Sequence, residues 1–496
     1  MTLEREAKFE VDDGFVLPDL SDLGDGLRGH PADTQRFVST YHDSADLRLI
    51  RWGGSLRVRT GQGWTVKLPH SGQSLVTRDE IVFQGSVERP PAEALDLVRG
   101  IVRGARLERV ARLQTLRRRV CIAAGDEVRP VAEVVDDEVS VLDGRRVVDR
   151  FREIEVELAE GAEPAEVKPV LAAIAACGAR PAGSVTKVAR ALGAPAIAAP
   201  DVVMPQVARR SSARDVIARA IADSVVRLIE HDAAVRLGDD PEGVHQARVA
   251  TRRLRSHLRT YRAMLERDWC DGLREELGWL GDELGAVRDL DVLEERFRRH
   301  GSALPGEDAG GLERVVDRVR RRRGASRDAL LASMRGTRYV ALLDALVEAA
   351  ANPRVLTEVA DAPAADALGV VMDAPWKHLR ARCRSLGSDP DDAALHEARI
   401  RAKRVRYAAE SLAPVFGKPA RRFARRAEVL QEVLGAHQDA VVAAAWLREE
   451  AMHAPARLSF AAGRLAQMET SVRDEARADW PDAWKRLRRT KPRFWR

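Results

Sequence analysis

The segment Leu3-Glu4-Arg5-Glu6-Ala7-Lys8-Phe9 decides the fold class of the N-terminal half. Because side chains alternate between the two faces of a β-strand, Glu4, Glu6 and Lys8 share one face, and the apolar residues take the other. Two carboxylates and an ammonium group therefore point the same way. Such a segment predicts a strand with one charged face and one packed face.

The same alternation recurs along the first 190 residues. It aligns Arg57 with Arg59, Arg117 with Arg119, and the three carboxylates of Glu153, Glu155 and Glu157. Segments 55–59 and 64–68 flank the glycine-containing turn 60–63, which is typical of a β-hairpin. Strands are also predicted at 79–84, 115–122, 131–141 and 150–158, and helices at 92–104 and 164–177. We therefore predict an α+β fold for residues 1–195, an antiparallel β-barrel or tunnel with flanking helices.

Charged strand faces of this kind have two interpretations. A single Arg-x-Arg or Glu-x-Glu pair is typical of an ordinary solvent-exposed strand face. Several such faces inside one closed barrel would set carboxylates for a hard divalent cation opposite cations for phosphate oxygens. The number of such sets favours the second interpretation, a site that hydrolyses a phosphoanhydride.

Length and composition point to two folded domains. The 496 residues exceed what one hydrophobic core usually supports, and 45% apolar with 32% charged residues is typical of a folded chain. No apolar run approaches the roughly 20 residues that span a bilayer, and a secretory stretch is missing from the start. The four cysteines form no Cys-x-x-Cys pair, which argues against a thiolate zinc site. We expect a cytoplasmic protein without a membrane partner.

The C-terminal half differs in pattern and in charge. Residues 192–212 contain three prolines and many small residues, which predicts a linker at 196–212 without regular structure. From 213 to 490, apolar residues recur at three- and four-residue spacing, which predicts an all-α domain. The formal net charge is −3 for residues 1–200 and +9 for residues 201–496. A basic half points to an anionic partner.

An internal repeat organises this half. Residues 244–255, Val-His-Gln-Ala-Arg-Val-Ala-Thr-Arg-Arg-Leu-Arg, match residues 395–406, Leu-His-Glu-Ala-Arg-Ile-Arg-Ala-Lys-Arg-Val-Arg, 151 positions later. The pattern Leu-Gly-x-x-x-Asp at 284–289 returns at 434–439, 150 positions later. The spacing predicts two repeated helical bundles.

Each repeat carries a cationic stripe, because helix positions i, i+3, i+7 and i+10 lie on one face. The first stripe contains His245, Arg248, Arg252, Arg255 and Arg259, with Arg253 beside it. The second contains His396, Arg399, Lys403 and Arg406, with Arg404 beside it. One such stripe is typical of a solvated helix face, whereas two copies facing each other would form a groove for a long polyanion. The histidines are expected to be structural, and metal binding by the pair is the lesser alternative.

The motifs of residues 1–190 together resemble the CYTH family of triphosphate tunnel metalloenzymes. They are Glu4-x-Glu6-x-Lys8, Tyr-His-Asp-Ser-Ala-Asp at 41–46, Arg57-x-Arg59, Lys67, Arg78-x-Glu80, Arg117, Asp137, Glu153-x-Glu155-x-Glu157 and Ser184-x-x-Lys187. Members hydrolyse inorganic triphosphate, thiamine triphosphate or RNA 5′-triphosphate ends, and some cyclise ATP, usually with Mg²⁺ or Mn²⁺.

That resemblance implies roles for individual residues. The metal ligands would be Glu4, Glu6, Glu155 and Glu157, with Glu153, Glu80 and Asp137 as further ligands or groups that orient water. The phosphate clamp would consist of Lys8, Arg57, Arg59, Lys67, Arg117 and Lys187. Two points stay open: whether Arg117, Arg119 or both face inward, and whether Asp136 replaces Asp137.

The repeat is similar to the CHAD domain, a helical module of two similar halves that binds inorganic polyphosphate, over roughly residues 205–490. The resemblance implies phosphate contacts by Arg248, Arg252, Arg253, Arg255, Arg259, Arg399, Lys403, Arg404 and Arg406, with His245 and His396 close by. In the Leu-Gly-x-x-x-Asp pattern, Asp289 and Asp439 are predicted to orient an arginine.

Both halves thus predict one ligand chemistry. The favoured function is a metal-dependent triphosphatase, acting on inorganic triphosphate or a nucleoside triphosphate, with a module that binds polyphosphate and places the enzyme at polyphosphate granules. The alternative is a polyphosphate-binding or granule-associated protein without turnover. Nucleic-acid binding is disfavoured because the basic stripes lack interleaved aromatic residues.

Overall fold

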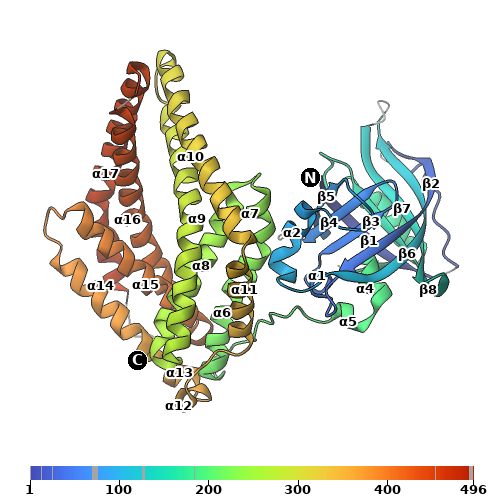
Figure 1. Ribbon diagram of the computed structural model, residues 1–496, viewed down its shortest axis with the longest axis horizontal. Helices are drawn as coiled ribbons and strands as arrows, with labels where there is room; N and C mark the ends of the chain where they lie inside the picture. The colour runs from blue at the N-terminus through green and yellow to red at the C-terminus, as the bar shows by residue number, and fades with distance from the viewer. Residues whose placement is uncertain are drawn as a thin grey trace. The chain divides into compact units, whose positions relative to one another are not determined.

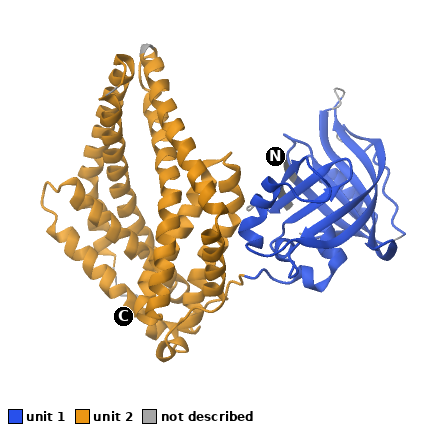
Figure 2. Cartoon of the chain, in the orientation of Figure 1, with its two compact units in different colours: residues 1–201 blue, residues 202–496 orange. Residues whose placement is uncertain are grey.

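The computed structural model describes residues 2–12, 14–24, 26–69, 76–125, 129–183, 185–452, 454–490 and 495, and for residues 2–4, 76–78 and 307 it describes the backbone alone (Figure 1). The chain divides into two compact units, Met1–Asp201 and Val202–Arg496 (Figure 2). The limits 1–195, 196–212 and 213–490 expected from the sequence stay predictions. The fold class is confirmed: an antiparallel β-barrel unit precedes an all-helical one.

The first unit is built on an antiparallel sheet. Its strands are β1 (Thr2–Val11), β2 (Leu27–Asp43), β3 (Ser55–Arg59), β4 (Gly63–Pro69), β5 (Val76–Phe83), β6 (Glu108–Ala124), β7 (Arg129–Asp143), β8 (Arg146–Leu158) and β9 (Arg180–Ala182). They follow the order β5-β4-β3-β2-β6-β7-β8-β1-β9, and β1 also pairs with β5. This last pairing closes the sheet into a barrel, with β9 added beside β1.

Alternation along the strands separates a packed outer face from a charged interior. Ile154 and Val156 of β8 pack with Val134 of β7 against α3 (Lys168–Ala176), whose Val170 and Ile174 are fully buried. The glutamates that alternate with those two β8 residues therefore point into the barrel. Burying that apolar face fixes the register, since a slip of one residue would turn every charged side chain outward.

The remaining helices of this unit are short. They are α1 (Arg48–Arg51), α2 (Ala92–Val102), α4 (Lys187–Leu192) and α5 (Ala194–Ile197). A second apolar cluster joins Val188 and Ala189 of α4 to Tyr41, Leu113 and Phe151 of the barrel. This packing brings the first residue of α4, Lys187, to the barrel interior.

Two features of this unit differ from the sequence-based prediction. The long strand β2 was missed, because Gly-His-Pro at 29–31 is typical of a turn and most side chains from 28 to 35 are exposed. In the sheet, a register shift between Pro31 and Thr34 accommodates that proline. The linker was predicted to lack regular structure, yet α5 occupies its first residues.

The second unit is helical and shows the predicted duplication. Its longer helices are α6 (Ala213–Glu230), α7 (Asp232–Leu237), α8 (Pro241–Tyr261), α9 (Arg267–Gly301), α10 (Ala309–Arg335), α11 (Thr337–Ala351), α14 (Asp373–Ser385), α15 (Asp392–Phe416), α16 (Lys418–Ala451) and α17 (Ala456–Arg489). The succession α8, α9, α10 is repeated as α15, α16, α17, and neighbouring helices in each succession pack together. α8 also packs against α15, so the two basic helices meet. No helix in the described part of the chain has the length and apolar character needed to cross a membrane.

Candidate functional site

The barrel interior brings together charged residues from opposite ends of the first unit. In the β1–β8 pairing, Glu6 lies opposite Glu157 and Lys8 opposite Glu155. Glu6, Lys8 and Glu155 are nearly completely buried. Strand pairing thus joins two motifs that lie about 150 residues apart in the sequence.

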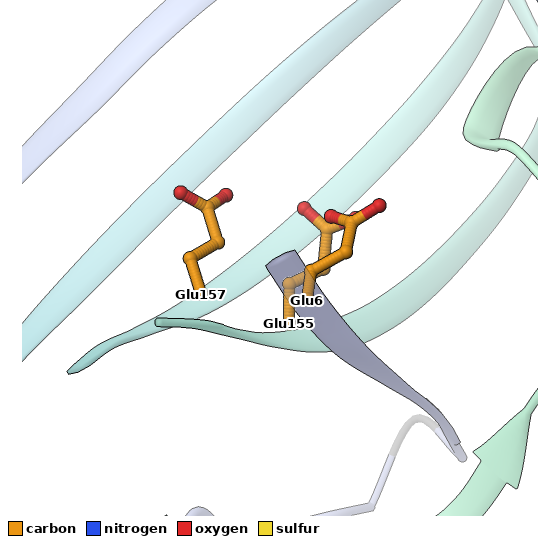
Figure 3. Close-up of side chains that lie close together, drawn as sticks. All are labelled: Glu6, Glu155 and Glu157. Carbon is orange, nitrogen blue, oxygen red and sulfur yellow. The ribbon is translucent and has the colours of Figure 1, made fainter. Parts of the chain in front are cut away.

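Three of these carboxylates form a compact acidic cluster, Glu6, Glu155 and Glu157. Each offers a carboxylate oxygen within 4.8 Å of the others, and all three side chains project to the same side of the sheet (Figure 3). Burial raises the pKa of Glu157, and the neighbouring charge of Glu155 raises it further. For Glu155, burial opposes ionisation, but Lys187, Lys8 and Arg117 outweigh it and hold its pKa well below the usual range.

Two lysines neutralise part of this charge. Lys8 Nζ lies 2.7 Å from Glu155 Oε1 and 3.4 Å from Glu6 Oε1. Burial opposes the charge on Lys8, but the two glutamates raise its pKa overall. Both contacts hold the ammonium charged beside the acidic cluster.

Lys187 enters the same interior from α4. Its Nζ lies 2.8 Å from Asp137 Oδ2 and 3.0 Å from Glu153 Oε1, and it also contacts Glu155. Burial disfavours its charge, but these carboxylates raise its pKa well above the ordinary value. Glu153 and Asp137 are therefore engaged by Lys187 rather than joined to the acidic cluster.

Arginines and a third lysine project into the same interior from β3, β4 and β6. Arg57 Nη2 lies 3.4 Å from Glu80 Oε1, and Lys67 Nζ lies 3.1 Å from Glu80 Oε2. Arg117 forms a two-point ion pair with Asp137, at 2.9 and 2.7 Å. Arg59 differs from these cations: among the described residues it has no carboxylate within ion-pair distance.

The surroundings of Arg59 leave its charge poorly compensated. Its Nε donates to the Ser39 hydroxyl at 2.8 Å, and its guanidinium lies 4.0 Å from the centre of the Phe37 ring. Burial and the nearby charge of Arg57 lower its pKa to about 9. An anion entering this cavity would find in Arg59 a cation without a competing carboxylate.

These groups surround a cavity of about 260 Å³. The lining residues are Glu6, Lys8, Tyr41, Gly53, Ser55, Arg57, Arg59, Lys67, Glu80, Arg117, Arg119, Glu133, Glu155, Glu157, Thr186, Lys187 and Val188. Most of the residues predicted for catalysis, metal binding and phosphate binding in this unit thus share one space. Tyr41 and Thr186 also line it, although no role was predicted for either.

The structure also addresses the two open points. Arg117 and Arg119 both line the cavity, but Arg119 is held at its edge by ion pairs with Asp33 and Glu133. Asp137 is fully buried beside Arg117, whereas Asp136 accepts from Arg152 on the other face of β7. The Glu4 and Arg78 side chains and Ser184 lie outside the described parts of the chain.

The second unit holds a basic cluster where α8 meets α15. It consists of Arg248, Arg252, Arg399 and Lys403. Burial lowers the pKa of Lys403 to about 7, and Arg252, Arg399 and Arg248 lower it further against the opposing effect of Asp439. Arg252 also donates to the Tyr407 hydroxyl across the helix crossing, at 2.9 Å. The two predicted stripes therefore do face each other.

Other members of the stripes have different surroundings. Arg253 and Arg406 each contact Glu410, at 3.0 and 2.6 Å, so both are partly neutralised. Arg404 and the exposed Arg259 lie near each other, and burial and this proximity lower the pKa of Arg404. Arg255 is exposed on the same helix.

Neither His245 nor His396 belongs to a group of three or more metal-ligating side chains among the described residues. Burial and the nearby charge of Arg288 lower the pKa of His245, and His396 has a buried Nδ1 without a hydrogen-bond partner. Over the same residues, the acidic cluster is the one group of three or more metal-ligating side chains.

Comparison with known proteins agrees with this division. The CYTH domain model matches residues 2–175 and the CHAD domain model matches residues 219–448. Two uncharacterized Mycobacterium tuberculosis proteins, Rv2226 of strain H37Rv and MT2285 of strain CDC 1551, are each 32% identical over 98% of this chain and 96% of their own. The chain belongs to the CYTH–CHAD family.

Two solved structures are similar to parts of this CYTH–CHAD protein. PptA from Streptomyces chartreusis is 23% identical over 55% of this chain and all of its own, with a TM-score of 0.45. The CHAD domain from the plant Ricinus communis is 28% identical over 58% of this chain and 93% of its own, with a TM-score of 0.43.

The acidic cluster fits the divalent cation that CYTH domains usually use. It offers carboxylate oxygens alone, which are the ligands of hard cations such as Mg²⁺ and Mn²⁺. The raised pKa of Glu157 shows that its negative charge is disfavoured beside Glu155 in a buried setting. A bound cation would relieve this repulsion, so the residues present suit the group that the family implies.

Proposed function

We propose that the N-terminal unit is a metal-dependent triphosphatase that acts on inorganic triphosphate. The observation that carries this proposal is the shared cavity, in which the acidic cluster faces Arg57, Arg59, Lys67 and Arg117. Apart from Gly53 and Val188, the described lining residues are charged or carry a hydroxyl group. Such a lining favours a compact polyanion over a substrate with a nucleobase.

Each group in the cavity then has a role. Glu6, Glu155 and Glu157 hold the cation, with Glu4 as a further candidate from the sequence. The cation, when bound, neutralises phosphate oxygens and lowers the barrier to attack by water. Arg59, Arg57 and Lys67 bind the substrate phosphates. Electrostatic preorganisation supplies most of the rate in a site of this kind.

The buried ion pairs keep this arrangement in place before substrate arrives. Lys8 and Lys187 hold Glu155 ionised, and Asp137 fixes the guanidinium of Arg117 at two points. Glu80 separates Arg57 from Lys67 and reduces their repulsion. Glu80 and Asp137 therefore act by positioning cations in this proposal.

A phosphate-release assay tests this function. It uses inorganic triphosphate, ATP, thiamine triphosphate and long-chain polyphosphate, each with Mg²⁺ or Mn²⁺ and after chelation. Glu6→Gln should lower turnover about 10²-fold or more, because it removes a ligand charge at the reacting centre. The exposed Glu160→Gln, just beyond β8, is the matched control and should behave like the wild type. Metal-dependent release that Glu6→Gln leaves unchanged would refute the proposed site.

The helical unit, we propose, binds inorganic polyphosphate at the α8–α15 crossing and places the enzyme at polyphosphate granules. The basic cluster supports this, because mutual repulsion among its four cations is relieved by a polyanion. Arg252→Ala with Lys403→Ala should weaken polyphosphate binding and leave triphosphate turnover intact. If the wild type binds polyphosphate but hydrolyses none of the four substrates, the alternative of a binding protein without turnover holds.

A further inference from the structure

Two glycines of the helical unit, Gly285 and Gly435, lie beside arginines of the basic cluster. A Cβ added to Gly285 of α9 would overlap Nη1 of Arg248 and approach its Cζ to 3.2 Å. The guanidinium of Arg248 thus lies against the bare backbone of the neighbouring helix. Only a residue without a side chain leaves that space open.

An aspartate one turn further along holds the same arginine. Asp289 Oδ1 lies 3.1 Å from Arg248 Nη2, and residues i and i+4 lie on one helix face, so Gly285 and Asp289 contact Arg248 together. The predicted contact of Asp289 with an arginine is therefore present. The Arg248 side chain is 22% exposed and the Asp289 side chain 66% exposed.

The second repeat contains a looser copy. Asp439 Oδ1 lies 3.6 Å from Arg399 Nη2, and a Cβ on Gly435 of α16 would lie 3.6 Å from Arg399 Nε, an ordinary contact. The pattern Leu-Gly-x-x-x-Asp thus accompanies an arginine in both halves, with close packing in the first alone.

We propose that Gly285 and Asp289 form an arginine seat that positions Arg248 for polyphosphate. The seat is a positioning device, because neither residue itself contacts the ligand in this scheme. The inference rests on the proposed binding of polyphosphate by the helical unit. In the first repeat, Arg248 is held in place before phosphate binds, whereas in the second repeat Arg399 is held more loosely.

The arginine seat matters because the cations of the basic cluster repel one another. Arg252, Arg399 and Lys403 repel Arg248, and a long side chain left free would turn toward solvent. Holding the guanidinium before binding avoids the cost of ordering it when the ligand arrives. Asp289 supplies the compensating charge, and Gly285 supplies the space.

Gly285→Ala tests the seat because it changes no charge. The overlap falls on the flexible end of Arg248, so the guanidinium should move while the helix stays intact. Using full-length protein and long-chain polyphosphate, we expect a five- to tenfold loss of affinity. We also expect the slope of log Kd against log salt to fall by about 0.7, the loss of one phosphate contact. The melting temperature should stay unchanged or rise slightly.

Two matched glycines serve as controls. Gly272→Ala, in the same helix with open space around it, should bind as the wild type does, and Gly435→Ala should do nearly so. In an Arg248→Ala background, Gly285→Ala should cause no further loss, since its effect passes through Arg248. An additional loss in that background, or wild-type affinity and salt slope for Gly285→Ala alone, would overturn the seat. Absence of polyphosphate binding by the wild type would instead overturn the proposed function, and the seat with it.

Discussion

Lys403 shows how the basic cluster affects a single residue. Burial and three neighbouring arginines lower its pKa from 10.5 to about 7. The unfolded chain therefore binds more protons than the folded one between these values. The charge of Lys403 destabilises the folded unit below about pH 7, and this destabilisation declines as pH rises from about 7 to 10.5. Polyanion binding has the opposite pH dependence and is favoured at low pH, because a polyanion binds the charged form of Lys403.

We expect polyphosphate affinity to be highest below pH 7 and to fall as Lys403 loses its proton above pH 7. Lys403→Arg keeps the charge and should flatten this dependence between pH 7 and 9, whereas Lys403→Met should bind weakly at every pH. Binding isotherms at constant ionic strength measure this effect. An unchanged pH profile in Lys403→Arg would assign the dependence to another group.

Arg59 and Arg117 occupy one cavity with different degrees of compensation. Arg117 is paired with Asp137, whereas Arg59 is held by a hydroxyl group and an aromatic ring. A buried carboxylate that loses its partner is strongly disfavoured. The two arginines should therefore differ in what they contribute to stability.

Arg117→Met should lower the free energy of unfolding of the first unit by about 2–3 kcal/mol, because Asp137 would keep Lys187 but lose both charged hydrogen bonds to Arg117. Arg59→Met should leave stability unchanged or higher, yet raise KM for triphosphate at least tenfold by removing a phosphate contact worth about 1.4 kcal/mol or more. Urea denaturation and steady-state kinetics separate the two effects. Equal stability losses in both variants would contradict this distinction.

At the level of elements, α4 carries Lys187 to the acidic residues. Thr186 begins this helix by accepting the backbone N–H of Ala189 at 3.1 Å, and Val188 anchors it in the apolar cluster. A helix of six residues has little stability of its own, so the cap and the anchor decide its position.

Thr186→Ala should destabilise the first unit by about 1 kcal/mol through loss of the cap, and should lower turnover by displacing Lys187. Thr186→Ser should preserve both properties. Ser212, which caps α6 with the same 3.1 Å geometry, provides the control: Ser212→Ala should destabilise the helical unit and leave turnover intact. Full activity of Thr186→Ala, measured at a temperature where it is folded, would count against this role of α4.

The two repeats differ in charge at one pair of positions where α8 meets α15. Under the 151-residue offset, Arg253 corresponds to Arg404 and Glu410 corresponds to Arg259. On one side of the crossing Arg253 contacts Glu410, and on the other Arg404 lies near Arg259. One side is thus neutralised while the other keeps its positive charge.

Arg259→Glu should create a second Arg–Glu pair. Because Arg259 is exposed, the gain in stability should be small, about 0.2–1 kcal/mol. Polyphosphate affinity should fall, with a smaller salt slope, since a cation has become an anion. Arg259→Gln should lie between the two in affinity. Undiminished affinity in Arg259→Glu would exclude this side of the crossing from the binding surface.

At the scale of the molecule, each unit has its own apolar cores and its own charged site. The barrel cores draw on residues up to 196, and the helical core joins α9, α10, α16 and α17. We expect the fragment 1–201 to hydrolyse triphosphate and the fragment 202–496 to bind polyphosphate, each within a fewfold of the intact chain. Circular dichroism should confirm folding first. Loss of either activity from a folded fragment would show that the site needs both units.

The sequence alone determined the elements whose pattern is local. Period-two alternation identified the charged strands, and three- and four-residue spacing identified the basic helices, because both depend on neighbours a few residues away. It failed at β2, where a Gly-His-Pro turn signal lies inside a strand that long-range pairing stabilises.

Only the tertiary structure decided which charges meet. Pairing of β1 with β8 places Glu6 opposite Glu157. The packing of α4 brings Lys187 into ion pairs with Asp137 and Glu153. The packing of α8 on α9 places the guanidinium of Arg248 against Gly285. These contacts depend on side chains far apart in the sequence. A local pattern carries no record of them, since burial and charge compensation are properties of the packed molecule.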